Sequence, residues 1–420
     1  MTGWTPVNDA NPPSPPFSKG GLGGFGSHFL TNSYLAIILL FMPYDLLIRG
    51  GRIFEPLAKS FRKADIAIAG GRVSRLAPSL EGEKASEVLD ASGLIVTPGL
   101  IDFHVHIFWL VHKISIHPDR LVPRAGTTTM VDGGSSGAIN FEAFKEFVLS
   151  RSSLNLLAFL NISLLGQVFE AQIPGVPPIF EYDDLRLVHV AQTVKCIEEN
   201  RNLIVGVKVR AYHGLTNLTP VHAALEAGEA AGVPVMIHTA PPPPAMSQYI
   251  HLLRPGDILT HLYHPQPGAL LDRQGKIRPE YREARERGVL METGLARWHT
   301  DFEVMQRAVG EGFWPDIIST DVTATNVEPL VRDVLFTGSK FMAAGMPLED
   351  VLAAMTIAPA HAMSRPDLAE LKEKGSADIA VLELRKEDFT FQDYFGHTLP
   401  GKERLCCRWL INKGKVVKEK

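Results

Sequence analysis

The chain has 420 residues, 45% of them hydrophobic, enough to bury the core of one barrel-sized domain and a smaller one. Its 42 Lys and Arg and 46 Asp and Glu are mixed along the sequence and give a formal net charge of -4, a balance that does not favour nucleic acid or an anionic membrane as partner. The three cysteines, Cys196, Cys406 and Cys407, have no spacing typical of a disulfide framework or zinc finger, so we expect a reducing, cytoplasmic compartment; a homo-oligomer is left open.

The first 42 residues differ from the rest of the chain. The stretch 11–25 is rich in Pro, Gly and Ser and has too few apolar side chains to build a core, so we expect 1–42 to be a disordered or dispensable extension. The apolar run 34–42 is too short to span a bilayer, and no small-residue cleavage site follows it, which argues against a membrane anchor or a secretory signal. We therefore expect the functional protein to start near Met42.

Strand patterns occur at both ends of the remaining chain. Short runs separated by Gly-Gly or Asp/Ser/Gly turns read as strands at 45–54, 64–76 and 87–96, and again at 377–384 and 408–417. Two β-rich ends around a different middle indicate one small β-sandwich made from both termini, with parts at 43–97 and 372–420.

The middle of the chain, 98–371, alternates apolar runs with helical patterns. The eight runs are 100–105, 127–132, 155–162, 204–209, 233–237, 257–262, 288–293 and 316–320. Continuous apolar runs are what a sheet buried on both faces requires, and intervening helices are what parallel strands need as crossovers. The count and the length predict an α/β fold with a closed (β/α)8 TIM-type barrel. An open doubly wound sheet is the alternative, but no Gly-rich phosphate loop follows the first run.

Polar side chains that bind metals in other proteins stand in or directly after these runs: His104, His106, Lys208, His238, His261 and Asp321. His104 and His106 are two apart on an expected strand, so both point to one face and can reach one ion. Each residue alone has an ordinary explanation, as a hydrogen-bonded core histidine or, for Asp321, as a helix cap. Their joint order predicts that all six converge at the C-terminal mouth of the barrel, where active sites are built.

Lys208 is the most discriminating of the six. A lysine inside an otherwise apolar run is costly to bury, so it must be neutralised, paired or modified. Reaction with carbon dioxide would convert its amine into a carbamate, an anion with two oxygens that can bridge two cations. The alternative is an unmodified lysine that pairs with an acid or extends to the barrel mouth, which would leave room for one metal only.

The motifs that carry a family resemblance are Thr97-Pro-Gly-Leu-Ile-Asp-Phe-His-Val-His106, Gly206-Val-Lys-Val-Arg210, Val235-Met-Ile-His-Thr239, Leu259-Thr-His261, Ile318-Ser-Thr-Asp321 and Gly375-Ser-Ala-Asp-Ile-Ala-Val381. With them, the sequence resembles the amidohydrolase superfamily of metal-dependent hydrolases over about residues 43–420. The branch it resembles includes dihydroorotase, hydantoinase and the amidohydrolase/deacetylase metallohydrolases. The first and last motifs are the most specific.

The resemblance implies a binuclear centre with two divalent ions, zinc first, and manganese or cobalt as replacements. It implies that His104, His106 and Asp321 bind one ion, that His238 and His261 bind the other, and that carbamylated Lys208 bridges both. Two cations that share a water molecule lower its pKa toward neutrality, which makes hydroxide available for attack. Asp321 would take the proton and deliver it to the leaving nitrogen or oxygen.

The expected activity is hydrolysis of an amide, cyclic imide or N-acyl C–N bond in a small molecule by metal-activated hydroxide. An esterase or lactonase that uses the same site is the nearest alternative. A metal-free assembly protein that kept the fold and lost the chemistry is the alternative from another class, and the presence of all six ligand types weighs against it.

The sequence says less about the substrate. Arg210 shares the face of Lys208 if the strand continues, and it either clamps a substrate carboxylate or orients a neighbouring carboxylate. Tyr212 and His213 are candidates for lining the pocket, exposed loop positions being the ordinary alternative. Further loop candidates of this kind are His264, Arg297 and His299. The loops 292–299 and 321–325 depart from the family pattern, so neither a deacetylase nor an esterase label is carried over.

Overall fold

A computed structural model describes residues 43–121, 125–168, 180–211, 215, 217–239, 242 and 244–417. The predictions for 1–42, Tyr212 and His213 fall outside these residues. Within the described ranges, no helix combines the length and the apolar character needed to cross a membrane.

One sheet contains strands from both ends of the chain. Its strands are β1 (Tyr44–Glu55), β2 (Ser60–Ala69), β3 (Arg72–Ala77), β4 (Ala85–Asp90), β5 (Ile95–Pro98), β13 (Ile379–Gln392), β14 (Thr398–Asn412) and β15 (Lys415–Val417). They follow the order β15-β14-β13-β5-β1-β2-β3, and β4 pairs with β1. The antiparallel pair of β5 and β13 joins the two ends. The small β-rich domain predicted from both termini is thus confirmed.

The sheet changes direction inside β1 and encloses a core of its own. The first half of β1 pairs with β4 and the second half with β5, and the register shifts between Ile48 and Gly51. Gly50 allows this shift because its φ of 72° lies in the left-handed region that favours glycine. Apolar side chains from both termini, among them Ile66 and Ile411, pack in one cluster and hold the two ends together.

The second sheet is parallel throughout and follows the chain order. Its strands are β6 (Leu100–Val105), β7 (Thr127–Gly137), β8 (Asn155–Asn161), β9 (Ile204–Arg210), β10 (Val235–His238), β11 (Ile258–Thr260) and β12 (Leu290–Met291). Every residue of β6, β7, β9 and β10 is buried, as a sheet covered on both faces requires. Seven of the eight predicted runs therefore contain a strand.

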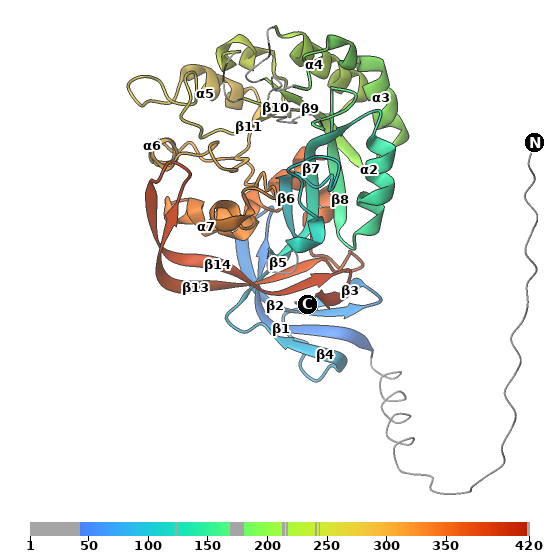
Figure 1. The fold of residues 1–420 in the computed structure, drawn as a ribbon. Helices are drawn as coiled ribbons and strands as arrows, with labels where there is room; N and C mark the ends of the chain where they lie inside the picture. Colours follow the sequence, from blue (N-terminus) through green and yellow to red (C-terminus); the bar gives the residue numbers. More distant parts are fainter. Residues whose placement is uncertain are drawn as a thin grey trace, which may run out of the picture. The chain divides into compact units, whose positions relative to one another are not determined.

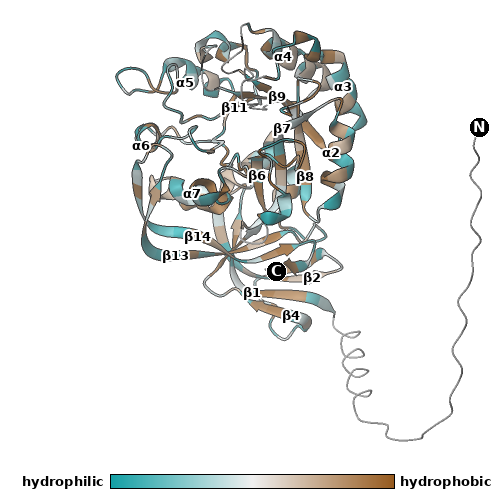
Figure 2. Ribbon diagram, in the orientation of Figure 1, coloured by the Kyte–Doolittle hydropathy of each residue, from teal (hydrophilic) through white to brown (hydrophobic). Residues whose placement is uncertain are grey.

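Helices lie around this sheet, and α2 to α7 are labelled in Figure 1. They are α2 (Phe141–Phe147), α3 (Val190–Glu199), α4 (Thr219–Ala231), α5 (Pro279–Glu286), α6 (Phe302–Gly310), α7 (Val334–Ala343), α8 (Leu348–Ala354) and α9 (Ile357–Ala362). Figure 2 shows the contrast in composition between α5, which is largely hydrophilic, and β8, which is hydrophobic between its terminal asparagines.

The eighth run closes the barrel without forming a regular strand. Two isolated parallel bridges, Glu292 with Ile317 and Val105 with Val322, connect it to β12 on one side and to β6 on the other. Between these bridges the backbone of Asp321 turns into the left-handed region, with φ of 48°, which interrupts the ladder. The predicted strand at 316–320 is corrected in this respect. The closure itself confirms the (β/α)8 barrel and excludes the open doubly wound sheet.

Candidate metal centre

The structure brings the six predicted side chains together at the C-terminal ends of the barrel strands. His104 lies in β6, Lys208 in β9 and His238 at the end of β10, while His106, His261 and Asp321 follow β6, β11 and the eighth run. All six are buried, with exposed fractions between 0% and 6%. Residues almost 220 positions apart in sequence therefore share one buried site.

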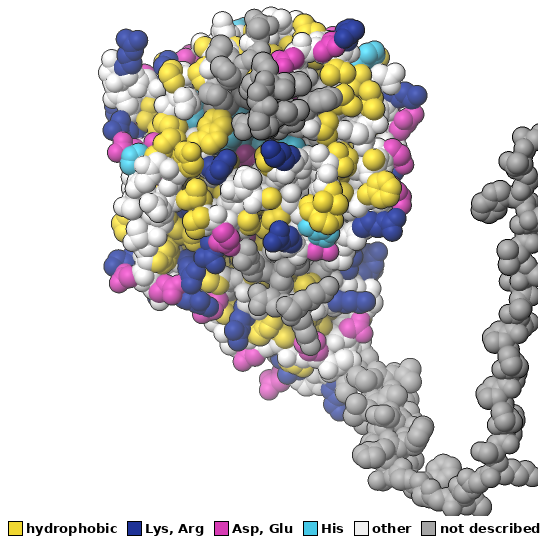
Figure 3. Space-filling model, in the orientation of Figure 1, with side chains coloured by type: hydrophobic (Ala, Val, Ile, Leu, Met, Phe, Trp, Pro, Cys, Tyr) yellow, Lys and Arg dark blue, Asp and Glu magenta, His cyan; other side chains and the backbone are white. Residues whose placement is uncertain are grey.

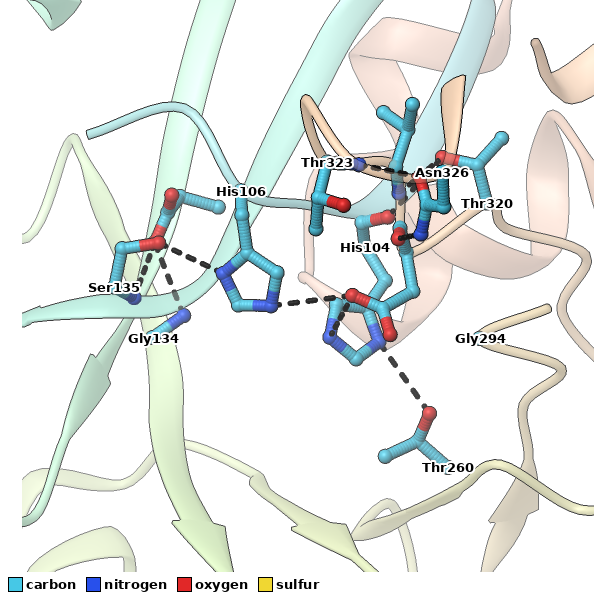
Figure 4. A network of polar contacts seen from close by, with 12 residues as sticks. His104, His106, Gly134, Ser135, Thr260, Gly294, Thr320, Thr323 and Asn326 are labelled. Atoms are coloured by element: carbon cyan, nitrogen blue, oxygen red, sulfur yellow. Dashed lines mark hydrogen bonds and ion pairs between the residues drawn. The ribbon is translucent and has the colours of Figure 1, made fainter. Parts of the chain in front are cut away.

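The carboxylate of Asp321 lies at the centre of this group. Its Oδ1 is 3.1 Å from His106 Nε2 and 3.7 Å from His104 Nε2, and its Oδ2 is 3.9 Å from His261 Nε2. Figure 4 shows the rings of His104 and His106 side by side at this point. Burial raises the pKa of Asp321, but the surrounding imidazoles outweigh burial and hold it well below its usual range. Asp321 is therefore an ionised carboxylate surrounded by imidazoles.

Lys208 points into the same group. Its Nζ lies 3.1 Å from His104 Nε2 and 3.2 Å from Met236 Sδ, and its side chain is fully buried. Burial lowers the pKa of Lys208 to about 8, although Asp321 and Glu292 act in the opposite direction. The side chain does not extend to solvent at the barrel mouth, and its amine is neutral more often than that of an exposed lysine.

The outer nitrogens of three histidines have fixed partners. His106 Nδ1 contacts Ser135 Oγ at 2.8 Å, and His261 Nδ1 donates to the carbonyl of Gly294 at 2.8 Å. His104 Nδ1 lies 3.3 Å from Thr260 Oγ1 and 3.5 Å from Glu292 Oε2, and Ser135 and Thr260 can be followed in Figure 4. Such contacts orient imidazoles that bind metals and direct the Nε2 lone pairs inward.

The atoms that face inward fit divalent cations. Ligand atoms of His104, His261 and Asp321 lie within 4.8 Å of one another, as do those of His238, His261 and His299. Among the described residues, neither His261 Nε2 nor Asp321 Oδ1 makes a hydrogen bond of good geometry. Burial lowers the pKa of His104 and His261, so both are neutral imidazoles, the form that binds metal. Buried polar atoms without partners are costly, and metal binding removes that cost.

Three glycines make room for the ligands, and sequence reasoning missed all of them. A Cβ at Gly133 would lie 2.2 Å from His104 Cδ2, and one at Gly134 would lie 2.5 Å from Lys208 Cβ. A Cβ at Gly294 would lie 2.7 Å from His261 Nδ1. The available signal was their position directly after the second and seventh apolar runs, where a glycine marks a close backbone approach.

Sequence reasoning also undervalued His299 and left the role of Arg210 open. His299, in the loop after β12, has its Nδ1 3.5 Å from Asp321 Oδ2, so it belongs to the centre rather than to the outer loops. The Nε of Arg210 donates to Glu181 Oε1 at 2.6 Å, and its Nη2 donates to the other oxygen of that carboxylate. This pair agrees with the second predicted role of Arg210, the orientation of a neighbouring carboxylate, and the binding of a substrate carboxylate stays a prediction. Tyr212 and His213 lie outside the described residues.

Comparison with known proteins agrees with this arrangement. The model of the amidohydrolase family matches residues 95–402. A deacetylase of Agrobacterium fabrum is 31% identical over 337 residues, which are 79% of this chain and 81% of the relative. Crystal structures of an adenine deaminase and of a dihydroorotase, each 28% identical, have TM-scores of 0.82 and 0.80, and each alignment covers 90% of this chain and 100% of the other. With a match that spans most of its length and includes all six convergent side chains, the chain belongs to the amidohydrolase family and is a metal-dependent hydrolase that acts on carbon–nitrogen bonds.

Proposed function

We propose that the protein hydrolyses an amide, cyclic imide or N-acyl bond of a small molecule at a binuclear metal centre. His104, His106 and Asp321 would hold one ion, His238 and His261 would hold the other, and Lys208, as a carbamate, would supply a ligand to both. The observation that carries the proposal is the convergence of six buried ligand-type side chains around Asp321 Oδ1 and His261 Nε2, which lack hydrogen bonds of good geometry among the described residues.

Bound divalent ions would supply an activated water molecule and polarise the substrate carbonyl, and zinc suits the imidazole-rich ligand set. Asp321 then serves as the base that takes a proton from the attacking water and as the acid that delivers it to the leaving nitrogen. Its contacts with several imidazoles support this role, because they hold the carboxylate ionised and fix its orientation.

The carbamate on Lys208 requires a neutral amine close to the ligands. When the amine attacks carbon dioxide, a bond forms between Nζ and carbon and one proton leaves the nitrogen. Full burial and a pKa lowered to about 8 favour the reactive neutral amine. The 3.1 Å contact between Nζ and His104 Nε2 supports a bridging position.

The family and the relatives support the proposed substrate class. One relative is a deacetylase, and one structural neighbour is a dihydroorotase. We place the protein in a reducing compartment such as the cytoplasm, because Cys196, Cys406 and Cys407 are all unpaired thiols.

The test is removal and restoration of metal, with a substrate panel as readout. We expect chelation to lower the hydrolysis of N-acyl amino acids, hydantoins or cyclic imides by roughly 100-fold or more, since metals contribute several kcal/mol to this chemistry. Zinc together with bicarbonate should restore it. Metal content, measured in parallel, should follow the activity.

Asp321→Asn is the matched variant for this experiment. It should lose about 10²- to 10⁴-fold in rate, the range typical of a positioned acid–base group. Full activity in this variant would remove Asp321 from the mechanism. Hydrolysis that is insensitive to chelation would contradict the proposed function, and cleavage of acyl esters with no cleavage of any amide would assign the site to the esterase or lactonase alternative.

A further inference from the structure

His299 enters the metal centre from a loop that the family motifs do not include. It lies between β12 and α6, and the residue is 6% exposed. The centroid of its ring is 3.8 Å from that of His261 and 5.0 Å from that of His238. The ligand nitrogens of these three histidines all lie within 4.8 Å of one another. Imidazoles from three different segments of the barrel mouth therefore face one point.

The polar contacts of His299 leave its ring available to an ion. Among the described residues, neither ring nitrogen makes a hydrogen bond of good geometry, and its Nδ1 has only a long contact of 3.5 Å with Asp321 Oδ2 in the ion-pair range. His261 Nε2 also makes no hydrogen bond of good geometry among the described residues, whereas His261 Nδ1 donates to the carbonyl of Gly294. Buried nitrogens normally have partners, so nitrogens that converge without them are suited to bind a cation.

The loop that carries His299 is anchored on both sides. Gly294 accepts from His261, and Thr300 Oγ1 donates to the carbonyl of Leu295 at 3.0 Å. The backbone N–H of Asp301 donates to the carbonyl of Tyr263 at 3.0 Å. The ring of Trp298 packs against His299 with centroids 4.0 Å apart. The imidazole is thus positioned before any ion binds, as an effective ligand requires.

We propose that His299 is a direct ligand of the ion that His238 and His261 hold, an inference that rests on the binuclear centre proposed above. Three histidines form the protein ligands of a known class of catalytic zinc site, and the Lys208 carbamate would be the fourth ligand here. The family resemblance assigns only two histidines and the Lys208 bridge to this ion. With a third imidazole as ligand, the binding of this ion depends less on the carbamate.

The test locates each ion in crystals of the zinc-loaded protein by anomalous scattering at the zinc edge. We expect the unaltered chain to show two zinc ions, with His299 at about 2.0–2.1 Å from one of them. His299→Ala should lose the ion beside His238 and His261 and keep the one beside His104 and His106. In chelator competition, His299→Ala should bind this ion at least about tenfold more weakly. Removing a residue that only hydrogen-bonds a metal ligand already costs about that much affinity. His299→Gln, which keeps polarity and bulk, repeats the test if the alanine variant folds poorly.

His264→Ala is the matched control, because His264 is 2% exposed and lies outside both groups of converging ligand atoms. It should leave both ions in place. Unchanged zinc beside His238 and His261 in both His299 variants overturns the inference and leaves the proposed function intact. Absence of metal from the unaltered, zinc-treated protein overturns the binuclear function and the inference with it.

Discussion

Two of the proposed ligands sit on backbone turns that only a few residue types adopt readily. His261 and Asp321 have φ of 62° and 48°, in the left-handed region, which costs energy for residues other than glycine. The turn at Asp321 is held by Asn326, whose Nδ2 donates to the Asp321 carbonyl at 2.8 Å and whose Oδ1 accepts from the Thr323 N–H at 2.7 Å. The direction of these ligands is therefore set by the main chain.

A substitution at Gly134 tests how closely the backbone must approach Lys208. An alanine there would place its Cβ 2.5 Å from Lys208 Cβ, and the side chain would have to move. We expect Gly134→Ala to lower the rate roughly 100-fold, since a displacement of about 1 Å at an active site can cost that much. Gly256→Ala is the control, because Gly256 has φ of 87°, close to the 91° of Gly134, with nothing within 4 Å of the added Cβ. Equal losses in the two variants would show that backbone strain, and not the collision with Lys208, lowers activity.

The convergence of the six side chains could be predicted from the sequence, whereas most of the groups that support them could not. Lys208 and His104 stand out because a polar side chain inside an apolar run is costly and needs a reason. Gly133 offered only its position after an apolar run, and Ser135 offered no signal, since the role of each exists only once the ring of a distant histidine lies against it. His299 was visible as a loop histidine, but a loop position gives no register from which convergence can be inferred.

At the scale of secondary structure, α7 contacts both α6 and the segment that precedes α7 through one buried lysine. Lys340 in the middle of α7 is buried, and its Nζ donates to the carbonyl of Leu330. The same Nζ lies 5.8 Å from the centre of the Phe302 ring, at the start of α6, and 5.1 Å from that of Phe336. One ammonium group thus connects α7 to α6 and to the segment between the last barrel run and α7.

Burial of Lys340 makes the stability of the protein depend on pH. Burial lowers its pKa from 10.5 to about 7, although Asp393 and Asp333 oppose the shift. Between these values the unfolded chain binds a proton that the folded chain releases, so the free energy of unfolding should rise from about pH 7 to pH 10. The slope from one such group is at most about 1.4 kcal/mol per pH unit. Denaturant unfolding of Lys340→Met should lack this slope.

Lys402→Met is the control for that measurement, because Lys402 is exposed and pairs only with exposed Asp388 in the described structure. Its pH dependence should match that of the unaltered protein. A Lys340→Met variant that keeps the full slope between pH 7 and 10 would show that other groups cause it.

The sequence predicted the positions of the barrel strands more accurately than their lengths. Runs 155–162 and 204–209 became β8 and β9 almost residue for residue, because continuous β-branched and aliphatic stretches suit a sheet buried on both faces. The run 288–293 became only β12, two residues long. Beyond β12, Glu292 keeps a single bridge to Ile317, and the backbone of Gly294 then turns into the left-handed region, with φ of 43°, and accepts from His261.

At the scale of the whole molecule, the barrel and the sheet from both termini depend on each other. The N–H of Leu405 in β14 donates to Ser339 Oγ in α7 at 3.0 Å, so the end of the chain contacts a barrel helix directly.

Charges of both signs are interspersed over the visible face in Figure 3, which agrees with the mixed charge pattern of the sequence. The pairing of β5 with β13 could not be read from the sequence, because local patterns identify strands but not their partners.

Two truncations test which ends of the chain the fold requires. A chain that begins at Met42 should keep its activity and unfolding temperature, because the upstream composition lacks the apolar side chains of a core. A chain that lacks residues 398–420 should fail to fold, because it loses β14 with its pairs to β13 and the buried side chains of Leu410 and Ile411. Circular dichroism and thermal unfolding distinguish these outcomes, and a shortened N-terminus that unfolds the protein would contradict the first.

The proposed metal centre lies at the contact between β6 and the eighth run, where the barrel closes. The first and last strands meet where the N–H of Asp321 donates to the carbonyl of His104 at 2.7 Å, and a single bridge, Val105 with Val322, completes the contact. The side chains of the same two residues lie within the proposed metal centre. An ion that binds both side chains would cross-link the first strand and the eighth run, so metal binding would also stabilise the closed barrel by mass action.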